Sequence, residues 1–251
     1  TKHAKMKEAI VESYELLNED KFAEINEKIQ EALKFNIDVN LGTNLYDVET
    51  RYLKLKESIH GRISTGFPNL DNILGGGWSR KELYCVLGPP GMGKSIFLPN
   101  FGIKALASGN DKDGEIGKGC NIVHYSFEMS EERVGLRYDG PVTNLFLHEL
   151  KDNEEAVRKA YRPGYRFNHD KRLFIKEFPT GAASVLDIEA HLEQLRTYEG
   201  FVPDMIIVDY GDIMRAAHKT NNTYEEQGWI FRELRGIAIE HNCVVLTATQ
   251  A

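Results

Sequence analysis

An eight-residue motif constrains the fold of this 251-residue chain more than any other feature. Residues 88–95 read Gly-Pro-Pro-Gly-Met-Gly-Lys-Ser, which matches the pattern Gly-x-x-x-x-Gly-Lys-Ser/Thr. The short apolar run 83–87 comes directly before the motif, and a helical pattern over 96–107 follows it. In this order of strand, loop and helix, backbone N–H groups and the helix N-terminus converge on phosphate oxygens. The alternative is a glycine-rich turn that only resembles the motif, and the flanking elements argue against it.

The motif assigns separate roles to its residues. Lys94 is expected to reach the β- and γ-phosphates of a nucleotide, and Ser95 to hold Mg²⁺. We expect the nucleotide to be contacted by Gly88, Pro89, Pro90, Gly91, Met92, Gly93, Lys94 and Ser95. The sequence therefore predicts a nucleotide site with an associated magnesium ion.

Strand-like and helix-like segments alternate from residue 63 onward, which is typical of a parallel α/β sheet. The expected strands are 83–87, 121–126, 172–176, 205–209 and 244–249. The run 205–209 is the most apolar, as expected for a strand buried on both faces. We expect helices over 96–107, over 128–137, and between the last two strands. With 41% hydrophobic residues, the chain can bury a core of this kind.

The first 60 residues follow a different pattern. Apolar residues recur at three- and four-residue steps over 4–35, which predicts helices that break near 18–20. Residues 36–63 look irregular around a short helix over 48–55, so this stretch is expected to be a linker. We therefore divide the chain into a helical segment, 1–60, and an α/β core, 61–251.

Composition and charge exclude several classes of protein. No run of about 18 apolar residues predicts a membrane-spanning helix, and the N-terminus does not resemble a signal peptide. Three widely spaced cysteines argue against a disulfide framework or a zinc site, and they fit a reducing compartment such as the cytoplasm. A net charge of −7 argues against a protein that coats nucleic acid, because such proteins are usually basic, but it does not exclude a local basic channel.

Three further polar residues follow the ends of predicted strands. Asp209 closes the most apolar strand, where an aspartate can join Ser95 in holding Mg²⁺; the alternative is an aspartate that simply ends a strand. Glu128 follows the 121–126 strand and can orient a water molecule, or it is only an acidic residue favoured in a first helical turn. Gln250 leaves the last strand and can contact the γ-phosphate, or it is only a strand-end amide.

A basic stretch with aromatic residues lies between residues 158 and 176. It contains seven Lys or Arg residues, a single acidic residue and four interleaved aromatic residues. Such a pattern can follow a phosphate backbone and stack bases. The alternative, which we favour, is a solvated loop whose aromatic side chains pack inward.

Several motifs occur in an order that resembles the replicative DNA helicases of the DnaB type. They are Arg-Ile-Ser-Thr-Gly-Phe-Pro-Asn-Leu-Asp at 62–71, Gly-Gly-Gly-Trp at 75–78, the glycine-rich loop, and Tyr-Ser-Phe-Glu-Met-Ser at 125–130. Residues 175–181 and 207–210 look most like the bacteriophage branch of this family. The ordered set is more specific than the phosphate-binding loop alone.

The resemblance implies a RecA-like ATPase core that works as a hexameric ring, with ATP at subunit interfaces and single-stranded DNA in the central channel. By position, Lys94 and Ser95 match the family's phosphate and Mg²⁺ residues, and Asp209 matches its Walker B aspartate. Glu128 matches the catalytic glutamate, and Gln250 matches a glutamine that senses the nucleotide and DNA state. Primase and a helicase loader are the other partners implied. The helix around 20–35 lies where the family has a linker helix that docks on the adjacent subunit; packing on its own core is the alternative.

The fold class expected from these observations is α/β: a RecA-like P-loop NTPase core with a mainly parallel sheet flanked by helices, preceded by an N-terminal helical linker. The family's arginine finger, its remaining core strands and its N-terminal domain have no counterpart here. We therefore expect these residues to belong to a longer protein, and this stretch alone to bind nucleotide but to turn it over slowly. Two alternatives stay open: another RecA-fold ATPase such as a recombinase, and a nucleotide-dependent assembly module without productive hydrolysis.

Overall fold

The structure, a computed structural model, describes residues 42–107, 118–163, 165–217 and 223–250. The helices predicted over 4–35 lie outside these residues. The chain divides into two compact units, Thr1–Leu53 and Lys54–Ala251, and only the second is described almost in full. The helix predicted over 48–55 is α3 (Val48–His60), which continues to His60 because no glycine or proline interrupts it before Gly61.

Five strands form one parallel sheet, as predicted. They are β1 (Leu83–Leu87), β2 (Ile122–Ser126), β3 (Leu173–Glu177), β4 (Met205–Asp209) and β5 (Val244–Thr249). Their order across the sheet is β1-β5-β4-β2-β3, and every neighbouring pair is parallel. The predicted α/β class is therefore confirmed, and strand bounds differ from the prediction by at most one residue.

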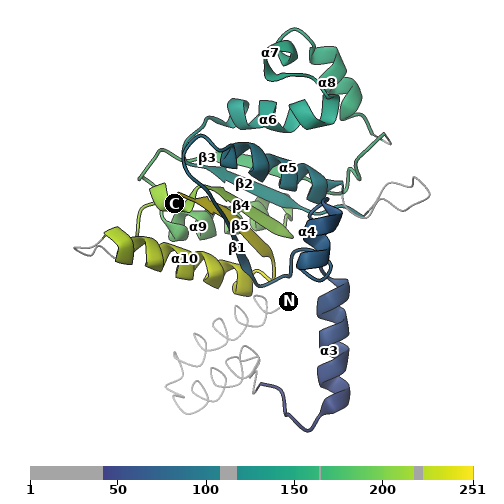
Figure 1. The fold of residues 1–251 in the computed structure, drawn as a ribbon, viewed down its shortest axis with the longest axis vertical. Coiled ribbons are helices and arrows are strands. Elements are labelled where there is room, and N and C mark those ends of the chain that lie inside the picture. The colour runs from purple at the N-terminus through teal and green to yellow at the C-terminus, as the bar shows by residue number, and fades with distance from the viewer. Residues whose placement is uncertain (1–41, 108–117, 164, 218–222, 251) are drawn as a thin grey trace, which may run out of the picture. The chain divides into compact units, whose positions relative to one another are not determined.

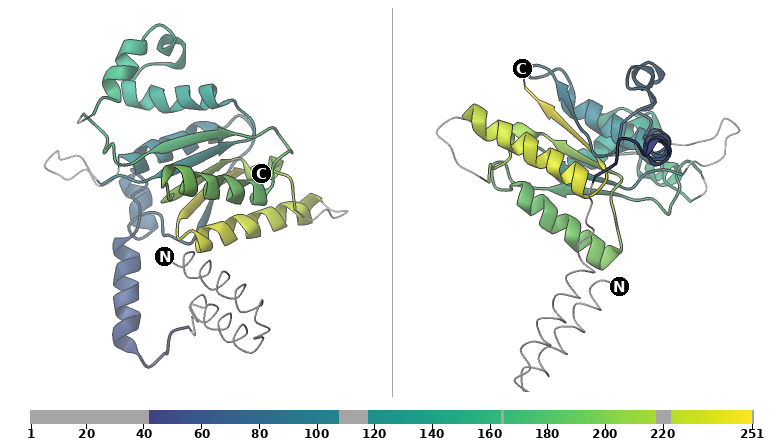
Figure 2. Two further views of the ribbon diagram at one scale, coloured as in Figure 1. Left: turned by 180° about the vertical axis from the view of Figure 1, so that it is seen from behind. Right: turned by 90° about the horizontal axis from the view of Figure 1, so that it is seen from below.

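Helices cover both faces of the sheet (Figures 1 and 2). The helices α5 (Lys94–Leu106) and α6 (Glu131–Thr143) lie on one face, and α9 (Val185–Glu199) and α10 (Thr223–Glu240) lie on the other. Four shorter elements connect these layers: α4 (Pro68–Ile73), α7 (Leu147–Leu150), α8 (Glu154–Ala160) and the 3₁₀ turn η1 (Gly211–Ile213).

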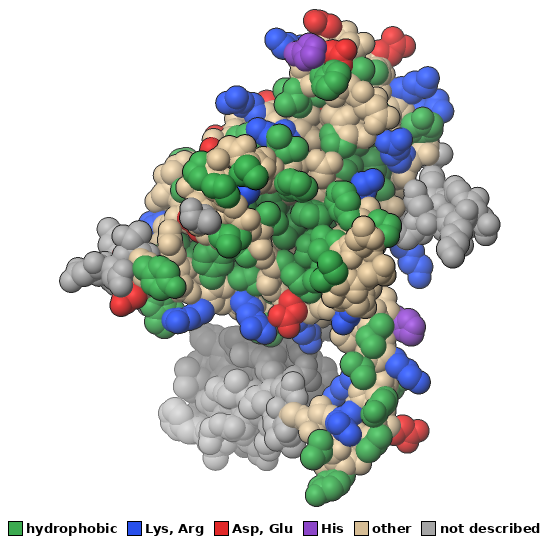
Figure 3. Space-filling model, in the orientation of Figure 1, with side chains coloured by type: hydrophobic (Ala, Val, Ile, Leu, Met, Phe, Trp, Pro, Cys, Tyr) green, Lys and Arg blue, Asp and Glu red, His purple; other side chains and the backbone are tan. Residues whose placement is uncertain are grey.

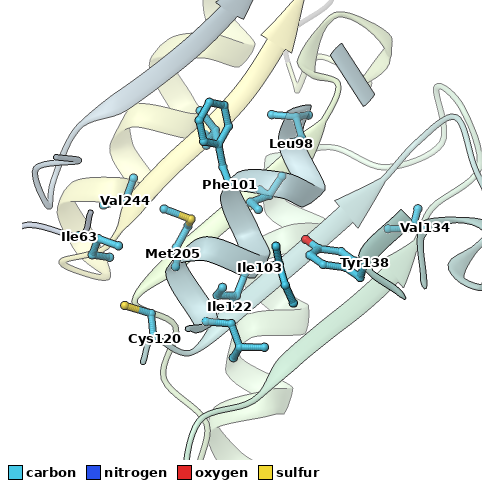
Figure 4. Packing of buried hydrophobic residues seen from close by; sticks show 14 of the residues in the cluster. Ile63, Leu98, Phe101, Ile103, Cys120, Ile122, Val134, Tyr138, Met205 and Val244 are labelled. Carbon is cyan, nitrogen blue, oxygen red and sulfur yellow. The ribbon is translucent and has the colours of Figure 1, made fainter. Parts of the chain in front are cut away.

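Alternate residues of the central strands pack into two separate hydrophobic cores, one on each face of the sheet. Met205 and Ile207 of β4 join Leu98 and Phe101 of α5 in the first core, part of which is shown in Figure 4. Ile206 and Val208 point to the opposite face and pack with residues of α9 and α10. All five residues of β4 are buried, which confirms the expectation of a strand covered on both faces.

Among the described residues, β1 pairs only with β5 and so forms one edge of the sheet. On the face drawn in Figure 3, hydrophobic side chains gather where this edge lies in Figure 1. Leu87 of β1, Phe97 of α5 and Ile73 of α4 are exposed by 67%, 50% and 81%. The edge therefore carries apolar side chains rather than the charged side chains that usually protect an edge strand.

Within the same described ranges, no helix is long and apolar enough to cross a membrane. All three cysteines are free thiols, and no cluster of three or more potential metal-ligating side chains was found in the part of the chain that the structure describes.

Candidate nucleotide-binding site

The residues predicted to form the site come together at the carboxyl edge of the sheet. Because all five strands are parallel, the loops that leave β1, β2, β4 and β5 start at this same edge. These loops surround a pocket at that edge. The residues that line the pocket are Pro90, Gly91, Gly93, Lys94, Ser95, Ile96, Glu128, Arg137, Tyr210 and Gln250. Of the predicted phosphate loop, Pro90, Gly91, Gly93, Lys94 and Ser95 line the pocket, whereas Gly88, Pro89 and Met92 do not. The three side chains predicted to be catalytic, Lys94, Glu128 and Gln250, all line it.

The phosphate loop runs from β1 into the first turn of α5. Gly93 caps α5 with a φ of +83°, a left-handed conformation that a residue with a Cβ adopts only under strain. The turn aims the free N–H groups at the start of α5 toward the pocket. The Nζ atom of Lys94 folds back and donates to the carbonyl oxygens of Gly88, at 2.6 Å, and Pro89, at 3.0 Å. Both acceptors are neutral carbonyl oxygens, so an anion in the pocket, which attracts the ammonium group more strongly, can replace them.

Ser95 and Asp209 meet at the floor of this region. The Oγ atom of Ser95 donates to Oδ1 of Asp209 at 3.2 Å, and Asp209 is fully buried. Its second oxygen, Oδ2, is buried and has no hydrogen-bond partner among the described residues. Burial, together with the nearby Glu128 carboxylate, raises the pKa of Asp209 to about 6. A hydroxyl beside a buried, incompletely satisfied carboxylate is a donor set that fits Mg²⁺.

Glu128 lies in a tight turn after β2. The Oγ atom of Ser126 donates to the carbonyl oxygen of Met129 and accepts from its N–H, which closes the turn. The N–H of Phe127 donates to the carbonyl oxygen of Asp209 at 2.9 Å, so the ends of β2 and β4 stay together. Phe127 and Met129 are buried, whereas Glu128 between them is exposed and lines the pocket. The turn therefore presents this one carboxylate to the site.

Gln250 follows β5 and is the last residue that the structure describes. Its Nε2 atom donates to the hydroxyl of Tyr210 at 3.1 Å, and both residues line the pocket. Its backbone N–H donates to the carboxylate of Asp212 at 2.9 Å. The strand-end amide is thus held inside the pocket rather than pointing freely into solvent.

Three of the lining residues, Ile96, Arg137 and Tyr210, were not predicted from the sequence to belong to the site. Arg137 lies on α6, and its positive charge acts to lower the pKa of Asp209. Within the described part of the chain it has no hydrogen-bond or ion-pair partner. Arg137 belongs to no sequence motif, and the motif at 207–210 assigned no role to Tyr210, so the three-dimensional arrangement identifies both as lining residues.

The basic stretch 158–176 lies outside this pocket, and most of its contacts are internal. Phe167 is buried and stacks on Tyr161 with ring centroids 5.6 Å apart. Arg172 pairs with Glu199, and Lys171 pairs with Asp204. These contacts fit the interpretation in which the aromatic residues of the stretch pack inward.

Comparison with protein families places most of the chain in one of them. Residues 62–251 match the model of the DnaB-like helicase C-terminal domain. A relative described as a DnaB-like replicative helicase, from Enterobacteria phage T4, is 26% identical over 229 residues, which is 88% of this chain and 46% of that protein. The replicative DNA helicase DnaB of Rhodothermus marinus is 27% identical over 243 residues, or 92% of this chain and 24% of that protein.

Solved structures show the same fold. One describes a DnaB-like replicative helicase and its interactions with primase; it superposes with a TM-score of 0.60 at 19% identity, covering 99% of this chain and 58% of that one. Another is described as an ATPase domain and superposes with a TM-score of 0.61 at 19% identity, covering 83% of this chain and 72% of that one. The chain spans less than half the length of each of the two curated relatives named above.

Proposed function

Since the chain belongs to the family of DnaB-like helicase C-terminal domains, we propose that it is the ATP-dependent motor of a replicative DNA helicase. In this role it couples ATP hydrolysis to movement along single-stranded DNA and to unwinding of the duplex. The observation that carries the proposal is the convergence of Lys94, Ser95 and Glu128 on one pocket at the carboxyl edge of the sheet, with the buried Asp209 bound to Ser95. This is the arrangement that phosphoryl transfer from a nucleotide requires.

The residues divide the work by position. The loop 88–95 holds the phosphates, and Lys94 exchanges its carbonyl partners for β- and γ-phosphate oxygens. Ser95 and Asp209 hold Mg²⁺, which when bound neutralises the negative charge that develops on the phosphates. Glu128 orients the attacking water, and Gln250 contacts the γ-phosphate from the end of β5. Arg137 adds a cation from the same chain.

The surface around the pocket supports assembly with further copies of the chain. Met92 in the phosphate loop and Ile96 directly after it have exposed fractions of 67% and 53%, and Phe97 is half exposed. An apolar rim around a nucleotide site suits burial against a neighbouring subunit. We propose a homo-hexamer with residues 61–251 as the ATPase core, residues 1–60 as the subunit-docking segment, and single-stranded DNA, primase and a loader as partners.

The test compares unwinding of a forked DNA substrate and ATP hydrolysis with and without single-stranded DNA. Lys94→Ala should abolish both activities because the γ-phosphate loses its only lysine partner from the loop. Lys159→Ala removes an exposed lysine of α8 and serves as the control, which should behave as the wild type. Unchanged unwinding by Lys94→Ala would overturn the proposal.

The two alternative functions give different results in the same assays. A recombinase-like ATPase would form filaments and exchange strands instead of unwinding a fork. An assembly module without productive hydrolysis would bind nucleotide, and its residual turnover would not change in Glu128→Gln.

A further inference from the structure

Strand β5 extends past the end of its neighbour β4. The β4–β5 ladder ends where Val208 pairs with Thr247, whereas β5 continues to Thr249 along β1 on its other side. On the β4 side, the segment that leads into Gln250 has therefore lost its backbone partners. A backbone N–H without a partner at this point would leave the direction of the Gln250 side chain undefined.

The carboxylate of Asp212 replaces the missing ladder. Asp212 lies in η1, immediately beyond β4, and both of its oxygens lie 2.8 Å from the hydroxyl of Thr249, which donates to them. Its Oδ2 also accepts the backbone N–H of Gln250 at 2.9 Å. One charged side chain thus binds two consecutive residues of the strand end, and bonds of this kind to a carboxylate are stronger than those between neutral groups.

Gln250 is consequently held at two points by the segment that follows β4. Its backbone is bound to Asp212, and its side-chain Nε2 donates to the hydroxyl of Tyr210. The second bond joins two neutral side chains and is the easier one to exchange. The amide can therefore leave Tyr210 for an oxygen in the pocket while Asp212 keeps its backbone in place.

We propose that Asp212 is a positioning residue that fixes Gln250 for recognition of the γ-phosphate. Asp212 does not line the pocket, so it acts through Gln250 and not on the nucleotide itself. The proposal rests on the proposed function, because it takes the ligand of the pocket to be a nucleoside triphosphate. It predicts that loss of Asp212 impairs the distinction between a triphosphate and a diphosphate more than it impairs nucleotide binding as such.

Calorimetric titration of the full chain with Mg²⁺ and either ADP or a non-hydrolysable ATP analogue tests this prediction. The quantity of interest is the ratio of the two dissociation constants. Asp212→Ala should lower the preference for the triphosphate about tenfold, with ADP affinity retained. Asp212→Asn should keep most of the preference, because its amide can accept from Gln250 and donate to the Thr249 hydroxyl.

A second pair of variants separates positioning from general stabilisation. Thr249→Val removes one contact with Asp212 and should lower the preference in the same direction as Asp212→Ala. Thr247→Val removes a hydroxyl, two residues earlier in β5, that binds the carbonyl of Val208 in β4 and the N–H of Gly211 in η1. It should lower the thermal stability of the chain but leave the triphosphate preference as in the wild type.

The side-chain amide of Gln250 gives a readout that does not depend on affinity. Its ¹⁵N–¹H signals should shift when the triphosphate analogue binds but not when ADP binds, and Asp212→Ala should remove this difference. Equal preferences in the wild type, Asp212→Ala and Thr249→Val would overturn the inference and leave the proposed function intact. A wild-type chain that binds neither nucleotide, or a Lys94→Ala variant that binds both as tightly as the wild type, would instead refute the proposed function.

Discussion

Asp209 is a buried carboxylate that the described residues satisfy only in part, as expected of a residue that binds a ligand. Its carboxylate is buried against Ser95, and one oxygen is left without a partner among the described residues. The cost of burying a charge appears as the raised pKa of about 6. A divalent cation at this position would offset that cost, because it favours the charged form of the carboxylate. We therefore expect Asp209 to contribute more to ligand binding than to the stability of the fold.

Arg137 supplies the first prediction at this scale. Its charge faces the acidic floor of the pocket, where Asp209 and Glu128 would otherwise repel a nucleotide's phosphates. Arg137→Gln should therefore lower kcat/KM for ATP hydrolysis by about tenfold or more. Arg133→Gln removes an exposed arginine one turn earlier on α6 and should have little effect. Steady-state kinetics measure both variants. Equal losses of kcat/KM in the two would show that Arg137 has no specific role.

The burial of His124 leads to a prediction of how the folding stability depends on pH. It is fully buried in β2, and its Nδ1 atom lies 2.8 Å from the hydroxyl of Tyr138. Burial lowers its pKa from 6.5 to about 3. Above pH 6.5 the ring is neutral in the folded and unfolded states. Between pH 6.5 and 3 only the unfolded state takes up the proton, so stability is lost as the pH falls through this window.

Urea denaturation of the wild type and His124→Gln at a series of pH values checks this prediction. Below pH 6.5 the wild type should lose unfolding free energy relative to His124→Gln by about 1.4 kcal/mol for each unit by which the pH falls. The difference should stay constant between pH 7 and 8. A constant difference down to pH 4 would show that His124 can be protonated in the folded state.

At the scale of elements, the close approach of α5 to α6 and β4 depends on Gly102. A Cβ at this position would lie 2.6 Å from the hydroxyl of Tyr138 and 3.0 Å from a side-chain carbon of Ile207. Tyr138 is buried and bound to His124, so it has no free space to move into. The spacing of this layer matters for the site, since α5 begins with Lys94 and Ser95.

Gly102→Ala should therefore destabilise the chain by about 1–3 kcal/mol and also weaken nucleotide binding. Gly236→Ala is the matched control, because Gly236 lies in α10 and a Cβ there meets nothing within 4 Å. It should stabilise the chain by about 0.5–1 kcal/mol through helix propensity alone. Thermal and urea unfolding measure both effects. The packing argument fails if the two substitutions change stability in the same direction.

The elements that the sequence predicted well are those with a strong local signal. The five short apolar runs correspond to β1 to β5. The strand β1, for example, lies between the charged Glu82 and Gly88. The helix α6 was predicted over 128–137 but spans Glu131–Thr143. Its start is displaced because the turn closed by Ser126 and Met129 comes first. The helix α9 was not predicted, although Val185, Ile188, Leu192 and Leu195 carry a helical spacing and are buried.

The candidate site was predictable to the extent that it follows from topology. Glu128, Asp209 and Gln250 each follow a strand, and parallel strands bring such residues to one edge. Arg137, Tyr210 and Asp212 could not be found in this way. Their positions depend on the rotation of α6 and on the path of the chain after β4, which no pattern in a single sequence specifies.

At the scale of the whole molecule, the formal charge of −7 and the basic stretch 158–176 do not conflict. Four of the seven basic side chains pair with acidic neighbours in the same chain, which reduces the free positive charge of the stretch. The apolar rim of the nucleotide pocket is the surface feature that a single copy of the described core leaves uncovered. We therefore expect association between copies to depend more on apolar contacts near the phosphate loop than on charge.

Phe97 provides the test of that expectation. It is 50% exposed on the first turn of α5, so an aspartate there places a charge in the proposed subunit interface. Phe97→Asp should weaken self-association by about tenfold or more and lower DNA-stimulated ATP turnover, while the affinity of each chain for nucleotide is retained. Tyr198→Asp changes an aromatic residue of α9 that is 82% exposed, and it should affect neither property.

Sedimentation velocity with a non-hydrolysable ATP analogue, together with the rate of ATP hydrolysis as a function of protein concentration, measures both effects. In the wild type the rate per chain should rise with concentration, because a site completed by a neighbour works only in the assembly. A rate per chain that is independent of concentration and unchanged in Phe97→Asp would mean that each copy hydrolyses ATP alone, and the ring would then have no part in the chemistry.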